Sequence, residues 1–143
     1  MNNKIFKYQK WLDELETPCP SIDSEERESV AFRWVFTPVK QENNFKPQFF
    51  KNKQRFNTKP PDVKCKSMGL SLYDTEENAK KRFEELKELM SEKAYQRLGT
   101  NIAKGTLVPS DGVSGTINNK GHFTFFTYEK IDLALKFAII SDL

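Results

Sequence analysis

The stretch from Cys65 to Gly99 limits the possible folds of this protein more than any other part of its sequence. A short apolar segment, Gly69-Leu-Ser-Leu-Tyr73, runs directly into a long helical pattern. The segment predicts a buried strand, and Asp74 or Thr75 is suited to cap a helix that ends at Gly99. Strand-to-helix corners of this kind often hold ligands. The apolar stripe of the predicted helix consists of Ala79, Phe83, Leu86 and Met90.

The order of the remaining elements indicates the fold class. No regular alternation of strand and helix is visible, which favours α+β with a mainly antiparallel sheet, an N-terminal helix and one long central helix. The length predicts a single domain, 1–143. We expect a bulge at Gly105, and we expect the apolar last strand to be central or covered. The other predicted elements are a helix at 3–16 and strands at 29–36, 100–108, 121–128 and 136–140.

Arg33 interrupts the clearest strand of the sequence. Alternation puts Val30, Phe32, Trp34 and Phe36 on one face, and leaves Arg33 between Ala31 and Val35 on the other. A charged side chain in a buried strand requires a partner. Arg33 is therefore expected to lie at a sheet edge, to form a structural salt bridge, or to face a phosphate or carboxylate ligand.

Residues 38–64 show no helical or strand periodicity and are interpreted as a long basic and aromatic loop. Basic residues set among aromatic rings suit a nucleotide or single-stranded nucleic acid, because charge follows phosphate and rings stack on bases. The alternative is a solvated loop whose phenylalanines plug the core. The candidate nucleic-acid-binding residues are Lys46, Lys51, Lys53, Arg55, Phe49 and Phe50.

The net charge of +3 conceals an asymmetry along the chain. Residues 1–30 carry four basic and seven acidic side chains, whereas residues 38–66 carry eight basic and two acidic ones. The net charges of these segments are therefore −3 and +6. The middle segment is the candidate for attracting an anion, and the acidic N-terminal segment could fold over it as an internal mask.

Composition also predicts the environment of the protein. No run approaches the ~20 apolar residues that span a bilayer, and the first residues do not resemble a signal peptide, so no membrane contact is expected. Cys19 and Cys65 have no short spacing and are interpreted as free thiols in a reducing cytoplasm. Two cysteines and one histidine are too few for a four-ligand zinc site, so no metal is expected.

Three further polar residues are candidates for a site, each with a plainer alternative. Ser71 could offer its hydroxyl to a ligand or bond to the backbone. His122, the single histidine, shares a strand face with Tyr128 but could equally lie at the surface or in the core. Glu129 follows an aromatic strand and could be a catalytic carboxylate or an ordinary exposed side chain.

Three pieces of the chain together resemble the core of the ADP-ribosyltransferase fold. They are the early strand Phe32-Arg33-Trp34, the Gly-Leu-x-Leu strand with its following helix (Gly69 to Phe83), and the late strand that ends at Glu129 before an apolar terminal strand. Members of that family split NAD at the bond between nicotinamide and ribose. The resemblance implies NAD as cofactor and a bacterial toxin or effector, which an antitoxin partner could accompany.

The same resemblance implies roles for individual residues. Arg33 would hold the pyrophosphate, Ser71 or Tyr73 would line the nicotinamide pocket, and Glu129 would stabilise the ribosyl cation. His122 is a further binding candidate on the ground of its strand position alone, not of the resemblance. A different class of function is a non-enzymatic module whose basic and aromatic loop binds nucleic acid or an acidic partner protein. A third is a subunit whose loop orders when it docks into a partner.

Overall fold

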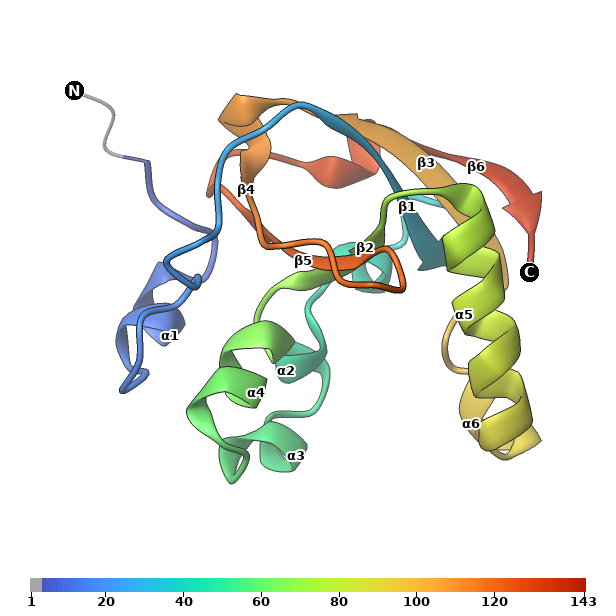
Figure 1. The fold of residues 1–143 in the computed structure, drawn as a ribbon, viewed down its shortest axis with the longest axis horizontal. Coiled ribbons are helices and arrows are strands. Elements are labelled where there is room, and N and C mark those ends of the chain that lie inside the picture. The colour runs from blue at the N-terminus through green and yellow to red at the C-terminus, as the bar shows by residue number, and fades with distance from the viewer. Residues whose placement is uncertain (1–3) are drawn as a thin grey trace.

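The protein, described here by a computed structural model over residues 4–143, is built on one antiparallel sheet (Figure 1). The strand order is β4-β5-β2-β1-β3-β6, which confirms the predicted α+β class. The strands are β1 (Ser29–Val35), β2 (Leu70–Tyr73), β3 (Asn101–Leu107), β4 (Gly112–Ser114), β5 (His122–Thr127) and β6 (Phe137–Asp142).

The two faces of the sheet are covered by different segments. One face packs around Leu72, Phe123 and Phe125, and the segments around Phe45 and Leu133 cover it. The other face is covered by helices, which lie together on one side of the sheet in Figure 1. These helices are α1 (Gln9–Asp13), α2 (Gln48–Lys51), α3 (Lys53–Asn57), α4 (Pro61–Ser67), α5 (Glu76–Leu89) and α6 (Glu92–Tyr95).

The central helix begins where the sequence predicts but ends earlier. Thr75 caps α5 by accepting a hydrogen bond from the backbone N–H of Asn78 at 3.0 Å. Ala79 and Phe83 are buried against the sheet, as the apolar stripe requires. The helix stops at Leu89 rather than Gly99, because Ser91 accepts a bond from the N–H of Ala94 and so starts the separate helix α6.

The segment 38–64 is not the structureless loop that was expected. It contains a 3-10 helix (Glu42–Phe45) and the short helices α2, α3 and the start of α4. Helices of four to seven residues span too few turns to leave a periodic signal. Their aromatic side chains pack against the N-terminal segment. The ring centroids of Tyr8 and Phe50 are separated by 4.0 Å, and those of Trp11 and Phe49 by 5.5 Å. Aromatic contacts therefore join the N-terminal segment to the basic segment.

Cys19 and Cys65 form a disulfide, so the prediction of free thiols is wrong. The two residues are 46 positions apart, and the fold brings the turn after α1 against α4. Disulfides persist mainly in oxidising compartments, so the cysteines no longer support a cytoplasmic location. None of the helices in residues 4–143 has both the length and the apolarity required to cross a bilayer.

Three details of the predicted strands are corrected. β6 lies at an edge of the sheet and exposes Ala138 and Ile140, so it is neither central nor covered. The irregularity in β3 falls between Ile102 and Ala103, whereas Gly105 pairs regularly and lies beneath the ring of Phe137. The short strand β4 lies within the expected loop at 109–121. The predicted helix at 3–16 is reduced to α1, and its first residue lies outside the described part of the chain.

Candidate functional site

The sheet opens between its two central strands. β1 pairs with β3 along its full length but with β2 only where Phe32 lies opposite Tyr73. Beyond that pair, the carbonyl oxygen of Ser71 has no hydrogen-bonding partner on the backbone of β1. It accepts instead a hydrogen bond from Nη1 of Arg33 at 2.8 Å. The guanidinium thus lies in the opening between the strands.

Asn44 holds the other side of the guanidinium. Its carbonyl oxygen accepts a bond from Nε of Arg33 at 2.6 Å. Its side-chain amide is buried and bonds to both the N–H and the carbonyl of Phe36 at 2.7 Å, and it also donates to the carbonyl of Pro38 at 3.1 Å. Asn44 therefore fixes the turn after β1 and the orientation of Arg33 together.

Arg33 is a buried cation without a carboxylate. Its residue is only 8% exposed, and no Asp or Glu in residues 4–143 forms an ion pair with it. Burial lowers the pKa of Arg33 to about 10, so the side chain stays charged at neutral pH. β1 is a central strand. The edge position and the structural salt bridge considered for Arg33 are therefore both wrong.

A cavity of about 340 Å³ begins at this guanidinium, and residues of α2 and α3 line it together with residues of α5 and of the segment after α6. Arg33 and three further cations line it, one each from α2, α3 and the segment after α6. Its aromatic walls come from β1, β2 and α3. No acidic side chain within residues 4–143 lines it. Its lining residues include Lys51, Arg55, Arg97, Trp34, Tyr73 and Phe56. We call this the Arg33 cavity.

Two pKa shifts reflect the character of the Arg33 cavity. Partial desolvation, followed by the positive charges of Arg33 and Lys46, lowers the pKa of Lys51. Burial raises the pKa of Tyr73 to about 12, so its hydroxyl remains a neutral hydrogen-bond donor at physiological pH. An anion bound between these groups would relieve the repulsion between Lys51 and Arg33.

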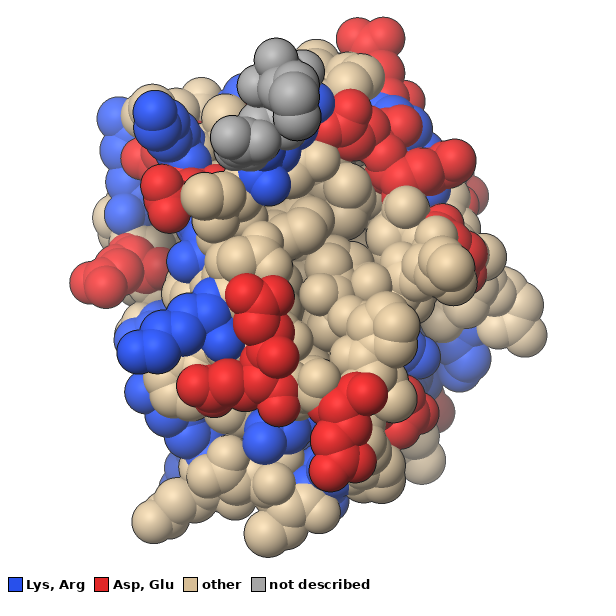
Figure 2. Space-filling view, turned by 90° about the vertical axis from the view of Figure 1, so that its left-hand side faces the viewer, with Lys and Arg blue, Asp and Glu red and all other residues tan. Residues whose placement is uncertain are grey.

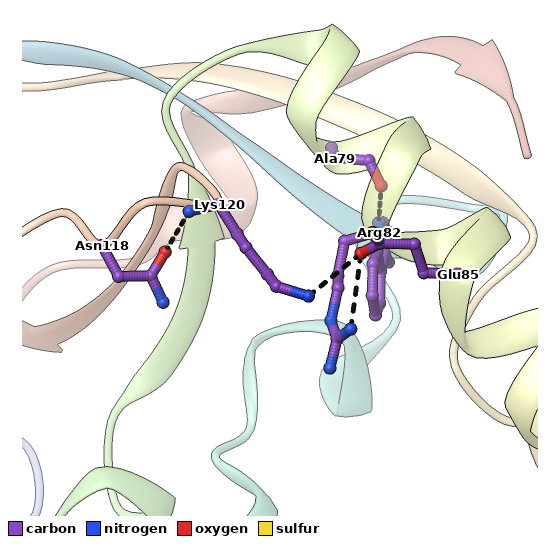
Figure 3. A network of polar contacts seen from close by, with 6 residues as sticks. Ala79, Arg82, Glu85, Asn118 and Lys120 are labelled. Carbon is purple, nitrogen blue, oxygen red and sulfur yellow. Dashed lines mark hydrogen bonds and ion pairs between the residues drawn. The ribbon is translucent and has the colours of Figure 1, made fainter.

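The wall formed by Trp34 is held rigidly. Its indole N–H donates to the carbonyl of Ala79 at 2.9 Å, and its ring stacks on Tyr73 with 5.3 Å between centroids. Close by, Arg82 and Lys120 converge on one carboxylate, that of Glu85, at 3.4 and 3.3 Å (Figure 3). These two cations outside the cavity thus have a counter-ion, in contrast to Arg33.

The charge of the cavity differs from that of the face shown in Figure 2. Figure 2 shows the side of the molecule that carries α1, where Asp and Glu side chains gather beside Lys and Arg around an uncharged area. Every charged residue that lines the Arg33 cavity is basic. The described part of the acidic N-terminal segment, residues 4–30, packs against the basic segment through Tyr8 and Trp11 but contributes no lining residue to the Arg33 cavity.

The cavity brings together five of the residues singled out in the sequence. Arg33, Ser71, Tyr73, Lys51 and Arg55 all line it. Ser71 is exposed there, and its side chain forms no hydrogen bond with any other residue in 4–143.

The other singled-out residues lie elsewhere. Glu129 is exposed in the turn after β5, where its backbone N–H donates to Ile5, and it lines none of the described cavities. His122 packs edge-on against Tyr73 and lines a different hollow. Burial, then the charges of Lys66 and Arg82, lower the pKa of His122.

Four of the six candidate nucleic-acid-binding residues also lie outside the cavity. Lys46 lines a separate hollow beside Tyr8, and Lys53 lies over the ring of Trp11 at 4.6 Å. Phe49 is fully buried and Phe50 stacks on Tyr8. Both rings therefore pack into the core, as expected if the phenylalanines of this segment plug the core. Phe49 has no exposed ring face for a base.

Sequence reasoning missed Trp34, Asn44 and Arg97. Trp34 was assigned to the apolar face of a strand, and Asn44 had no pattern around it. Arg97 was counted within the long helix, but that helix ends early and the chain turns Arg97 towards the cavity. No group of three or more His, Cys, Asp or Glu side chains within residues 4–143 is arranged to hold a metal ion.

Comparison with known proteins does not assign the Arg33 cavity to a known class of binding site. No family model matches the chain, and neither a curated protein nor a solved structure is significantly similar to it.

Proposed function

We propose that this protein binds a nucleotide, a ligand that combines phosphate with a planar base, in the Arg33 cavity. The observation that carries the proposal is the buried guanidinium of Arg33. Two of its five N–H groups donate to the carbonyls of Asn44 and Ser71, which leaves N–H groups free for a ligand. A buried charge without a counter-ion is unfavourable, and phosphate would supply both the negative charge and the acceptor oxygens.

The other lining residues suit the remainder of a nucleotide. Lys51, Arg55 and Arg97 add positive charge at the surface of the cavity. The rings of Trp34 and Phe56 offer apolar walls, and stacking of a base on an aromatic side chain contributes about 1–3 kcal/mol.

The proposal is restricted to binding. Cleavage of NAD would need a carboxylate near the ribose to stabilise positive charge. Glu129 does not line the cavity, and neither does any other acidic residue in the described part of the chain. Turnover of NAD therefore stays a prediction that only the resemblance to ADP-ribosyltransferases makes.

The test is calorimetric titration with AMP, ATP and NAD. Arg55→Ala and Arg97→Ala change exposed side chains and leave the buried Arg33 in place, so the fold is retained. A charge-assisted hydrogen bond contributes about 1.5–3 kcal/mol. Each variant is therefore expected to weaken binding about 10-fold or more.

Lys93→Ala is the matched control, because Lys93 is exposed on α6 and lines none of the described cavities. Its affinity should equal that of the wild type. Absence of binding by all three compounds, or equal affinities in the wild type, Arg55→Ala and Arg97→Ala, would overturn the proposal.

A further inference from the structure

A second hollow adjoins the Arg33 cavity. Its volume is about 240 Å³, and it lies over α4 and the start of β2. Four residues line both spaces: Arg33, Gln48, Phe56 and Ser71. The two hollows therefore adjoin one another at Arg33, and we call them the first and second lobes and, taken together, the groove.

The second lobe has the same charge character as the first. Lys66 lines it, and none of the acidic residues that the structure describes does. Lys66 forms no ion pair with any other residue in 4–143. The basic lining therefore runs from Arg97 in the first lobe, through the guanidinium of Arg33, to Lys66 in the second.

Apolar surface accompanies the charge along the groove. The half-buried ring of Phe56 belongs to both lobes, and Pro47 and Val63 line the second lobe. A mononucleotide has one base and one cluster of phosphates, so it does not use both lobes. A strand with several phosphates and unpaired bases does.

We infer that the groove binds a single-stranded oligonucleotide, with consecutive phosphates along the basic residues and a base in each lobe. This inference rests on the proposed function and extends it from one nucleotide to a strand. Proteins that bind single strands combine a basic groove with rings on which bases stack. Bases in a duplex are already stacked and paired, so they do not reach these walls.

The experiment measures fluorescence anisotropy with a labelled oligothymidylate of about eight nucleotides, together with competition by thymidine monophosphate. The oligonucleotide is expected to bind about 10-fold or more tightly than the monophosphate. Lys66→Ala should weaken binding of the oligonucleotide and leave that of the monophosphate unchanged, whereas Arg97→Ala should weaken both. Lys59→Ala is the control, because Lys59 belongs to the same basic segment and lines neither lobe.

Salt provides a second readout. The logarithm of the affinity for single strands falls with the logarithm of salt concentration with a slope of about −0.7 for each phosphate neutralised. Lys66→Ala should therefore make the slope shallower by about 0.7, and Lys59→Ala should not change it.

The outcomes separate the two proposals. If the monophosphate binds in an Arg97-dependent way but the oligonucleotide binds no more tightly, the strand inference is wrong and the proposed function stands. A duplex of equal length that binds as well as the single strand, or a Lys66→Ala protein with unchanged oligonucleotide affinity, also overturns the inference. If neither ligand depends on Arg97, both proposals fail.

Discussion

Reduction of the Cys19–Cys65 disulfide should lower the stability of the protein by an amount that follows from the loop it closes. The two residues are 46 positions apart, and the loop between them contains β1, α2 and α3. Cross-linking a loop of this length removes about 13.5 cal/mol/K of entropy from the unfolded chain, which corresponds to about 4 kcal/mol at 25 °C.

This free energy converts into a shift of the melting temperature. Unfolding entropy is about 2.1 cal/mol/K per residue, so a chain of 143 residues gains about 0.30 kcal/mol/K on unfolding. Loss of about 4 kcal/mol should therefore lower Tm by about 13 °C. Reduction should lower Tm because the unfolded chain gains conformational freedom, whereas the native contacts between α1 and α2 remain.

Differential scanning calorimetry with and without reductant measures the shift, and alkylation of the thiols verifies that reduction is complete. The Cys19→Ala/Cys65→Ala double variant is the control: it should melt near the temperature of the reduced protein and should not respond to reductant. A fully reduced wild type that melts within about 3 °C of the oxidised one would show that the closed loop does not stabilise the protein. Thiols that react with alkylating agent before reduction would show that the disulfide is not formed.

Two further predictions concern Asn44 and His122. Asn44→Ala removes the two 2.7 Å bonds to Phe36, so thermal denaturation should show a loss of about 2 kcal/mol, and nucleotide affinity should fall because the turn that holds Arg33 loosens. Unchanged stability would exclude this role for Asn44. Burial lowers the pKa of His122 in the folded state, so below the unfolded value of about 6.5 the unfolded chain takes up the proton first. The free energy of unfolding should therefore fall between pH 7 and pH 5 in urea titrations, and His122→Phe should flatten that slope; an equal slope in both proteins would contradict it.

Local patterns predicted most of the secondary structure. The alternation around Arg33 marks β1, and the pattern from Gly69 through Thr75 marks the junction of β2 and α5, because both depend on side-chain periodicity and capping within a few residues. The helices of residues 38–64 were missed because none of them exceeds two full turns. Such short helices are stabilised by packing against other elements, here by aromatic contacts with α1 and the residue before it.

Part of the candidate site was also visible in the sequence. A charged residue between Ala31 and Val35 is unusual enough to single out, and the cavity indeed brings Arg33 together with Ser71 and Tyr73. Glu129 was grouped with them by its place after a strand. Which strand ends share a cavity depends on strand order and on what covers each face, so sequence position could not separate Glu129 from the others.

Local patterns were enough to predict the α+β class, the central strands and the start of α5, since alternation, capping residues and chain breaks act between near neighbours. The assembled fold was needed to show that β6 is an edge strand, that Cys19 meets Cys65, and that β1 separates from β2 around the guanidinium of Arg33. These features depend on contacts between residues far apart in the chain. Their free energies arise from packing and desolvation in the assembled fold, which no local pattern records.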